Sequence, residues 1–400
     1  MRIAIVHYWF VGMRGGEKVI EALCRLYPDA DIFTHVYRPG AVSPEIKKHR
    51  ITTSFIGRLP RPEKFYKSYL PLMPMALENL DLRGYDLIIS SESGPSKGII
   101  PPAEAMHICY CHSPMRYVWN MYQDYRERSG WFTRMMMPPI MHYIRNWDAI
   151  SALRVHHFVA NSKTVARRLQ TYYRRDSQVI FPPVDTGAFE LAPRSELADY
   201  YLMVGELVAY KRPDLAVHAF NQTGRKLVII GSGEMLGKIR EMAGPTISVL
   251  GSQPFSVLRE HYARCKALVF PGEEDFGIVP VEAMASGRPV IAYGRGGATE
   301  TVIADRTGIF FEEQSVQAII EAIERLERMD IDPAAITAHA HGFGQHVFAD
   351  RMKAFVDRCL SEGRGTDLPP AVSDGIAGPG RPAQLSPDAR SAGENGYLLS

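Results

Sequence analysis

The chain has 400 residues, of which 46% are hydrophobic and 22% charged, with a formal net charge of +2. A chain of this length exceeds what one hydrophobic core usually supports, so we expect two domains. The five cysteines are scattered and odd in number, which excludes a simple disulfide framework and favours a reducing compartment. No apolar run reaches the roughly 18 residues of a spanning helix. We therefore expect a cytoplasmic protein.

Positive charge is concentrated in the first half of the sequence. Residues 1–185 carry 25 Lys and Arg against 16 Asp and Glu, and the remainder carries 21 against 28. Basic residues mixed with aromatics over 47–67 suit an anionic membrane surface or a lipid-diphosphate acceptor, although a solvated face has the same composition. We expect no nucleic-acid partner, because no helix-turn-helix, RRM or zinc pattern accompanies the charge.

Short apolar runs alternate with helical patterns along the chain, which predicts parallel sheets with crossover helices. After the first strand, apolar residues at helical spacing from Val19 to Tyr27 predict a helix with one buried face. The predicted strands of the first half are Ile3–His7, Asp31–Thr34, Leu87–Ser90, His107–Cys111, His157–Ala160 and Gln178–Phe181.

Consecutive prolines at Pro182 and Pro183 interrupt regular structure and mark the predicted domain boundary. The strand–helix alternation then restarts. The predicted strands are Tyr201–Val204, Lys226–Gly231, Thr246–Leu250, Ala267–Pro271, Pro289–Ala292 and Gly308–Phe311, and the helices Leu215–Phe220, Glu234–Met242, Val257–Ala263, Val279–Ala285, Val316–Arg328 and Val347–Cys359.

This order predicts an α/β protein of two Rossmann-like, doubly wound sheets facing across a cleft. The predicted domains are 1–183 and 184–345, followed by a helix over 346–361 that returns to the first domain. The segment 362–400 is rich in Gly, Pro, Ser, Ala and Asp and is predicted to be disordered. Ligands of such sheets bind beyond the carboxyl ends of the strands.

The segment 271–290 carries the sharpest chemical pattern. Two acids, Glu274 and Glu282, flank the start of a predicted helix, and Pro280 suits its first turn. Helix N-termini offer free amides to a diphosphate, and carboxylates accept hydrogen bonds from sugar and ribose hydroxyls. A helix capped by acids, without any ligand, would give the same pattern.

This segment resembles the fingerprint of glycosyltransferase family 4, whose members are retaining enzymes of GT-B fold. The matching residues are Glu274, Phe276, Gly277, Glu282, Ala283, Ala285, Gly287, Pro289 and Val290. The resemblance covers about residues 1–360. It implies that Glu274 contacts the donor sugar, that Glu282 contacts the nucleotide ribose, and that Ile278 lies at the donor.

Other parts of the chain match the family in the expected order. The resemblance implies that Gly15 and Gly16 approach the donor phosphate or acceptor, and that Gly251 and Ser252 lie near the base. By itself, the glycine pair indicates no more than a tight turn. Arg116, Tyr117 and Trp119 are the predicted acceptor-binding residues.

His112 follows a predicted strand, and by resemblance it lies near the transferred sugar. A lone histidine is more often a structural hydrogen-bonding residue. His107, Cys109, Cys111 and His112 are not expected to hold a metal, because alternation along the strand separates them at unsuitable spacings. We predict no metal and no other cofactor.

Lys211 matches the family lysine that neutralises the diphosphate leaving group. However, Glu206 occupies the position that arginine usually holds, and a carboxylate there would repel phosphates. We expect Arg212 or Arg295 to supply the second positive charge.

The runs 7–10, 111–119 and 210–215 look like those of bacterial polysaccharide mannosyltransferases. The resemblance implies GDP-mannose as donor, a polyprenyl-diphosphate-linked oligosaccharide as acceptor, and attachment at the inner-membrane surface. It also implies same-face transfer, in which the donor phosphate deprotonates the acceptor. The alternatives are a UDP-sugar glycosyltransferase, a GT-B nucleotide-sugar epimerase and a non-catalytic saccharide-binding assembly protein.

Overall fold

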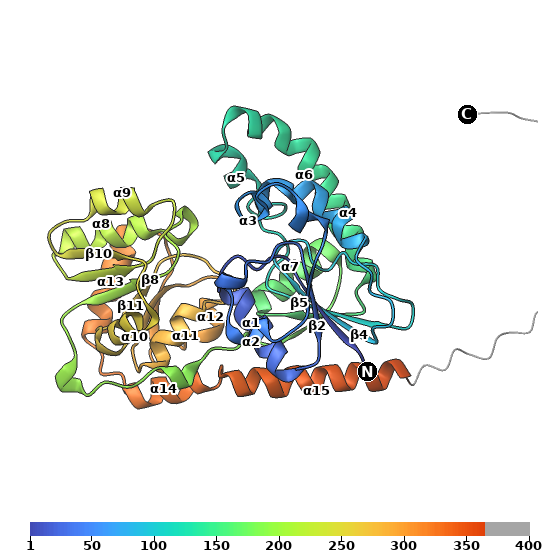
Figure 1. Cartoon of the computed structure of the whole chain (residues 1–400). Helices are drawn as coiled ribbons and strands as arrows, with labels where there is room; N and C mark the ends of the chain where they lie inside the picture. Colours follow the sequence, from blue (N-terminus) through green and yellow to red (C-terminus); the bar gives the residue numbers. More distant parts are fainter. Residues whose placement is uncertain (365–400) are drawn as a thin grey trace, which may run out of the picture.

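The computed structural model describes residues 1–364 as two α/β domains that lie side by side (Figure 1). The first domain contains a seven-stranded parallel sheet in the order β3-β2-β1-β4-β5-β6-β7. Its strands are β1 Ile3–His7, β2 Asp31–Thr34, β3 Ile51–Thr53, β4 Leu87–Glu92, β5 Met106–Cys111, β6 His157–Ala160 and β7 Ser177–Val179. Its helices are α1 Gly15–Leu26, α2 Pro44–Lys47, α3 Pro62–Phe65, α4 Met73–Glu78, α5 Tyr122–Arg128, α6 Trp131–Ser151 and α7 Lys163–Tyr173.

The second domain contains a six-stranded parallel sheet in the order β10-β9-β8-β11-β12-β13. Its strands are β8 Tyr201–Val204, β9 Leu227–Ile230, β10 Ile247–Gly251, β11 Leu268–Phe270, β12 Val290–Tyr293 and β13 Gly308–Phe311. The helices are α8 Pro213–Thr223, α9 Leu236–Met242, α10 Phe255–Arg264, α11 Ile278–Ala285, α12 Ala298–Thr301, α13 Val316–Glu327, α14 Pro333–His341 and α15 Gln345–Arg364. The prediction of two doubly wound sheets is confirmed.

The strand order reverses at one point in each sheet. In the first sheet, β1 lies between β2 and β4, and in the second, β8 lies between β9 and β11. The connections on either side of β1 and β8 leave in opposite directions, which opens a crevice at the carboxyl ends of these strands. Gly15 begins α1 after β1, and Lys211 and Glu274 lie in the segments that follow β8 and β11, so these predicted site residues lie at the switch points.

Helix α14 lies beneath the second domain, and α15 continues beneath the first domain and packs on it (Figure 1). Its side chains Phe348, Met352 and Val356 join the buried cluster that contains Ile5 of β1 and Leu23 of α1. The predicted return of the last helix to the first domain is confirmed. In the first sheet, β1, β2 and β4 place side chains in buried clusters on both faces, which explains their nearly continuous apolar sequence.

Strand β3 and helices α2 to α7 of the first domain escaped the sequence analysis. Strand β3 has only three residues, all half-buried, which is too short a run for an alternation signal. Helix α6 contains Pro138 and Pro139, which obscure the helical pattern because prolines disfavour helix interiors. The predicted boundary at 183/184 falls between the end of β7 and the start of β8. The prediction of disorder from residue 362 is wrong for 362–364, which belong to α15, and the rest of that segment, 365–400, lies outside the described residues.

Candidate nucleotide-sugar site between the domains

Lys211 and Glu274 form the centre of the candidate site. Lys211 ends the 3₁₀ segment Ala209–Lys211 after β8, and its Nζ lies 2.7 Å from Oε1 of Glu274 in the loop before α11. Burial alone would lower the pKa of the Lys211 amine, but the Glu274 carboxylate and other negative groups hold it above its usual value. The pair places a permanent cation and a hydrogen-bond acceptor side by side at the second switch point.

Glycines allow the loops around this pair to pack closely. A Cβ on Gly272 would lie 2.5 Å from the Cα of Lys211, and one on Gly296 would lie 2.4 Å from the Glu274 carbonyl oxygen. Gly296 also has φ +70°, a conformation that residues with a side chain rarely adopt. Larger residues at these positions would separate the loops that hold Lys211 and Glu274.

Helix α11 begins at the same place. Gly277 precedes it with φ +87°, and a Cβ on Gly15 of the first domain would lie 3.0 Å from the Ile278 side chain. The starts of α1 and α11 therefore face each other across the domain boundary. Free amides at two helix starts and the Lys211 amine together form an anion-binding environment.

Glu282 lies further along α11 and is bound within the second domain. Its Oε2 accepts a hydrogen bond of 2.9 Å from the Tyr262 hydroxyl. Burial raises the pKa of the Glu282 carboxyl to about 7. Its role at a ribose stays a prediction, and Tyr262 is a positioning residue that the sequence analysis missed.

The first domain brings His112 to the carboxyl end of β5. Its Nε2 lies 2.8 Å from Ser91 Oγ, which lies 3.2 Å from Nδ1 of the fully buried His7. Burial, with His7 nearby, lowers the pKa of His112 to about 3, so the imidazole is neutral near pH 7. A neutral ring can hydrogen-bond a sugar hydroxyl but carries no charge, and the bond to Ser91 fixes its orientation.

The predicted acceptor-binding residues lie in the loop after β5 but are not equally accessible. Arg116 reaches the second domain, with its guanidinium 4.9 Å from the Tyr210 ring centre and 3.6 Å from Asp275. Tyr117 donates to the Met115 sulfur at 3.1 Å. Trp119 stacks on Tyr172 and donates to Asp148 at 2.7 Å, so its indole nitrogen is already engaged.

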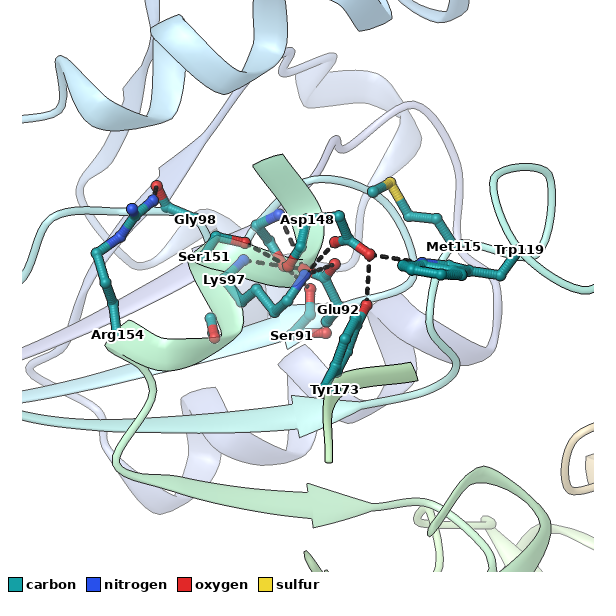
Figure 2. A network of polar contacts seen from close by, with 12 residues as sticks. Ser91, Glu92, Lys97, Gly98, Met115, Trp119, Asp148, Ser151, Arg154 and Tyr173 are labelled. Carbon is teal, nitrogen blue, oxygen red and sulfur yellow. Dashed lines mark hydrogen bonds and ion pairs between the residues drawn. The ribbon is translucent and has the colours of Figure 1, made fainter. Parts of the chain in front are cut away.

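A buried charge cluster supports this loop (Figure 2). Lys97 contacts Glu92 at 3.3 Å and also binds Asp148, and none of the three side chains is exposed. Asp148 of α6 accepts from Trp119 and Tyr173, while the Glu92 carbonyl accepts the His112 amide at 2.8 Å. The cluster therefore joins β4, α6 and α7 to the segment that carries His112, a link the sequence analysis did not predict.

The remaining predicted residues are more dispersed. Arg212 pairs with Asp214 at 3.1 Å, and the exposed Arg295 lies over the Tyr293 ring. Gly251 ends β10, the edge strand of the second sheet, and Ser252, the next residue, donates to Ser232 at 3.1 Å. In residues 1–364, no group of three or more His, Cys, Asp or Glu side chains is arranged to hold a metal ion.

Arg14, which the sequence analysis missed, crosses the domain boundary. Its Nη1 lies 3.8 Å from Oε2 of Glu206, and both side chains are about half exposed or more. Arg14 directly precedes Gly15 and donates its backbone amide to Glu17 at 3.0 Å, which caps α1. Its position next to the glycine pair was the available signal, but its partner lies 192 residues away.

Further polar contacts hold the two domains together. Asp275 binds Arg168 of α7, and Glu300 of α12 accepts from the amides of Lys163 and Thr164 at 2.6 and 2.9 Å. The carboxylate of Glu300 thus caps the start of α7 from the opposite domain. These contacts define the spacing between the His112 loop and the Lys211–Glu274 pair.

Two known families match the two domains described above. The family described as Glycosyltransferase Family 4 matches residues 13–188, and that described as Glycosyl transferases group 1 matches residues 192–342. The chain belongs to glycosyltransferase family 4. The resemblance drawn from residues 274–290 is therefore confirmed at the level of the family.

Curated relatives match this family-4 chain over part of its length. A GDP-mannose-dependent alpha-(1-6)-phosphatidylinositol monomannoside mannosyltransferase of Mycobacterium tuberculosis is 31% identical over 36% of this chain and 45% of its own. A D-inositol 3-phosphate glycosyltransferase of Segniliparus rotundus is 28% identical over 51% of this chain and 53% of its own. The O-antigen chain mannosyltransferase RfbU of Salmonella typhimurium is 27% identical over 56% of this chain and 64% of its own. The chain spans about half the length of the curated relatives it matches.

Solved structures share the two-domain architecture. Sucrose-phosphate synthase of Thermosynechococcus elongatus aligns with a TM-score of 0.66 and 19% identity over 90% of this chain and all of its own. Anabaena HepE in complex with UDP and glucose aligns with a TM-score of 0.65 and 14% identity over 89% of this chain and 99% of its own. These similarities show the GT-B fold of this family-4 chain.

Proposed function

We propose that the protein is a retaining glycosyltransferase that transfers mannose from GDP-mannose to a lipid-linked saccharide in cell-surface polysaccharide synthesis. The observation that carries this proposal is the Lys211–Glu274 pair at the start of α11, 2.7 Å apart and opposite Gly15. The cation and the helix amides suit a diphosphate, and the carboxylate suits the hydroxyls of the attached sugar.

In the proposed reaction, the bond between the anomeric carbon and the diphosphate breaks as the acceptor hydroxyl attacks the same face. The acceptor proton passes to the departing phosphate oxygen, so no enzymic base or covalent nucleophile is needed. Lys211 stabilises the charge that develops on the leaving diphosphate. His112 is neutral and orients a sugar hydroxyl. The interdomain contacts of Asp275 and Glu300 keep water from the donor.

The choice of mannose is supported by the relative that is named for GDP-mannose and by RfbU, which is named as a mannosyltransferase. The test incubates the purified chain with a panel of radiolabelled nucleotide sugars in chelator, with and without a membrane lipid extract. We expect label from GDP-mannose to enter the lipid fraction without added metal. Transfer from UDP-glucose alone would contradict the donor, interconversion without acceptor would indicate an epimerase, and donor binding without turnover would indicate a binding protein.

Arg14 offers a second positive charge for the diphosphate from across the domain boundary. We expect Arg14→Ala to weaken binding of the donor nucleotide about tenfold, since a hydrogen bond to a charged group contributes roughly 1.5–3 kcal/mol. Glu206→Arg in the same variant should restore the affinity, because it places the cation on the opposite side of the same gap. Titration of GDP followed by fluorescence or calorimetry measures both effects.

Arg212→Ala and Arg295→Ala serve as matched controls, because they remove the two cations proposed from the sequence. If either weakens GDP binding as much as Arg14→Ala does, the second positive charge for the diphosphate comes from the second domain. If Glu206→Arg fails to rescue Arg14→Ala, the Arg14 assignment is wrong.

A further inference from the structure

The helical hairpin of α5 and α6 projects from the first domain (Figure 1). Its outer end carries large apolar side chains that the protein leaves uncovered. Trp131 is 77% exposed, Phe132 60% and Met135 57%, with Met136 also exposed. We call these four residues the hairpin tip. Isolated exposed apolar residues are ordinary, but a contiguous group of this kind marks an interaction surface.

The exposure of the tip extends around the whole helix. Residues 131–136 are all exposed, and Met137 is the first buried side chain along α6. Six successive helical residues point in every direction around the axis, since one turn takes 3.6 residues. A partner protein would contact one side of such a helix, whereas a bilayer surface surrounds it.

The charges around the tip complement an anionic surface. Between Trp131 and Trp147, helix α6 has Arg134 and Arg145 but no Asp or Glu. The 3₁₀ segment Tyr66–Leu72, which follows α3, packs through Leu70 near Ile140 and Ile144 of α6. The exposed cations of α3 and this segment form a basic collar of Arg61, Lys64 and Lys67. The nearby acids are Glu63, which faces Arg38 at 3.7 Å, and Asp124 and Glu127 of α5.

We propose that the hairpin tip inserts into the headgroup region of an anionic membrane while the basic collar contacts lipid phosphates. Trp, Phe and Met side chains are suited to this region, because their apolar bodies leave water there. In residues 1–364, no helix is long and apolar enough to cross a bilayer. The proposed insertion of the tip is a contact with one membrane surface.

This attachment would also orient the candidate site, an inference that rests on the proposed function. At the base of α6, Arg145 donates to the Val118 carbonyl at 2.7 Å, and Asp148 accepts from Trp119. The loop that carries Arg116 is thus held about 14 residues from the tip, or about 20 Å along the helix. A lipid-linked acceptor could keep its lipid in the bilayer and present its saccharide to the cleft.

The test is sedimentation of the full chain with vesicles of phosphatidylcholine, with and without phosphatidylglycerol. We expect binding to the anionic vesicles, weakened by salt, and loss of at least tenfold in partitioning for Trp131→Ser/Phe132→Ser/Met135→Ser. The matched control Leu191→Ser/Phe255→Ser removes side chains that are 45% and 51% exposed in the second domain, and it should bind as the wild type does. Trp131 fluorescence should shift to the blue on binding.

Two outcomes would overturn the proposal. One is equal vesicle binding by the tip variant and the wild type. The other is a tip-dependent dimer in analytical ultracentrifugation with no vesicle binding, which would make the tip a contact between copies of the chain. Donor hydrolysis in lipid-free solution should be the same for the tip variant, so failure of the attachment is distinguishable from failure of the proposed activity.

Discussion

Replacing Lys97 by methionine is expected to lower the free energy of unfolding of the first domain by about 3–5 kcal/mol. The ammonium lies between Glu92 and Asp148, and none of the three side chains is exposed (Figure 2). Methionine keeps the length of the side chain but leaves two carboxylates buried without a cation. The cost of desolvating those carboxylates is then uncompensated.

Urea denaturation followed by tryptophan fluorescence measures this effect, because all four tryptophans lie in the first domain. The matched control is Lys353→Met in α15, whose pair with Asp357 is 64% and 60% exposed. Exposed pairs contribute about 0–1 kcal/mol, so this control should unfold nearly as the wild type does. Equal stability of Lys97→Met and Lys353→Met would show that the buried cluster does not stabilise the domain.

The neutral triple variant Lys97→Met/Glu92→Gln/Asp148→Asn separates charge from packing. We expect it to be more stable than Lys97→Met, because it removes the unpaired carboxylates. The amide oxygen created by Asp148→Asn can still accept from the Trp119 indole or the Tyr173 hydroxyl, so the comparison isolates the effect of charge.

The largest kinetic effect is expected for Lys211→Met, with a fall in kcat of about 10²–10³-fold. This is the range measured when one preorganised group that stabilises transition-state charge is removed. In the proposed reaction Lys211 faces the diphosphate, and its pKa is held above the usual value by Glu274 against the effect of burial. Lys211→Arg preserves the charge and should retain more of the activity.

Initial rates with the donor identified by the nucleotide-sugar panel provide the measurement. Lys238→Met, an exposed lysine on α9 of the same domain, is the control and should leave kcat unchanged. If Lys211→Met turns over as fast as Lys238→Met, the leaving group is stabilised elsewhere. A rise in KM with kcat preserved would mean that Lys211 binds donor and transition state equally.

The family and the fold could be predicted because their signals are local. The two glutamates eight positions apart and the glycine turn at Gly277 lie within one loop and one helix, so a short stretch of sequence is enough to identify them. Alternating apolar runs located the strands to within one or two residues, since buried parallel strands require continuous apolar sequence. Short or interrupted elements such as β3 and α6 lacked such a signal.

What the sequence determined by itself was the existence of two doubly wound domains and the identity of Lys211, Glu274 and His112 as site candidates. The tertiary structure alone decided which groups face them: Arg14 opposite Glu206, Ser91 and His7 behind His112, and Asp148 between Lys97 and Trp119. The physical reason is distance along the chain. Periodicity reports the faces of one element, whereas the pairing of charges from separate elements depends on how the sheets and helices pack together.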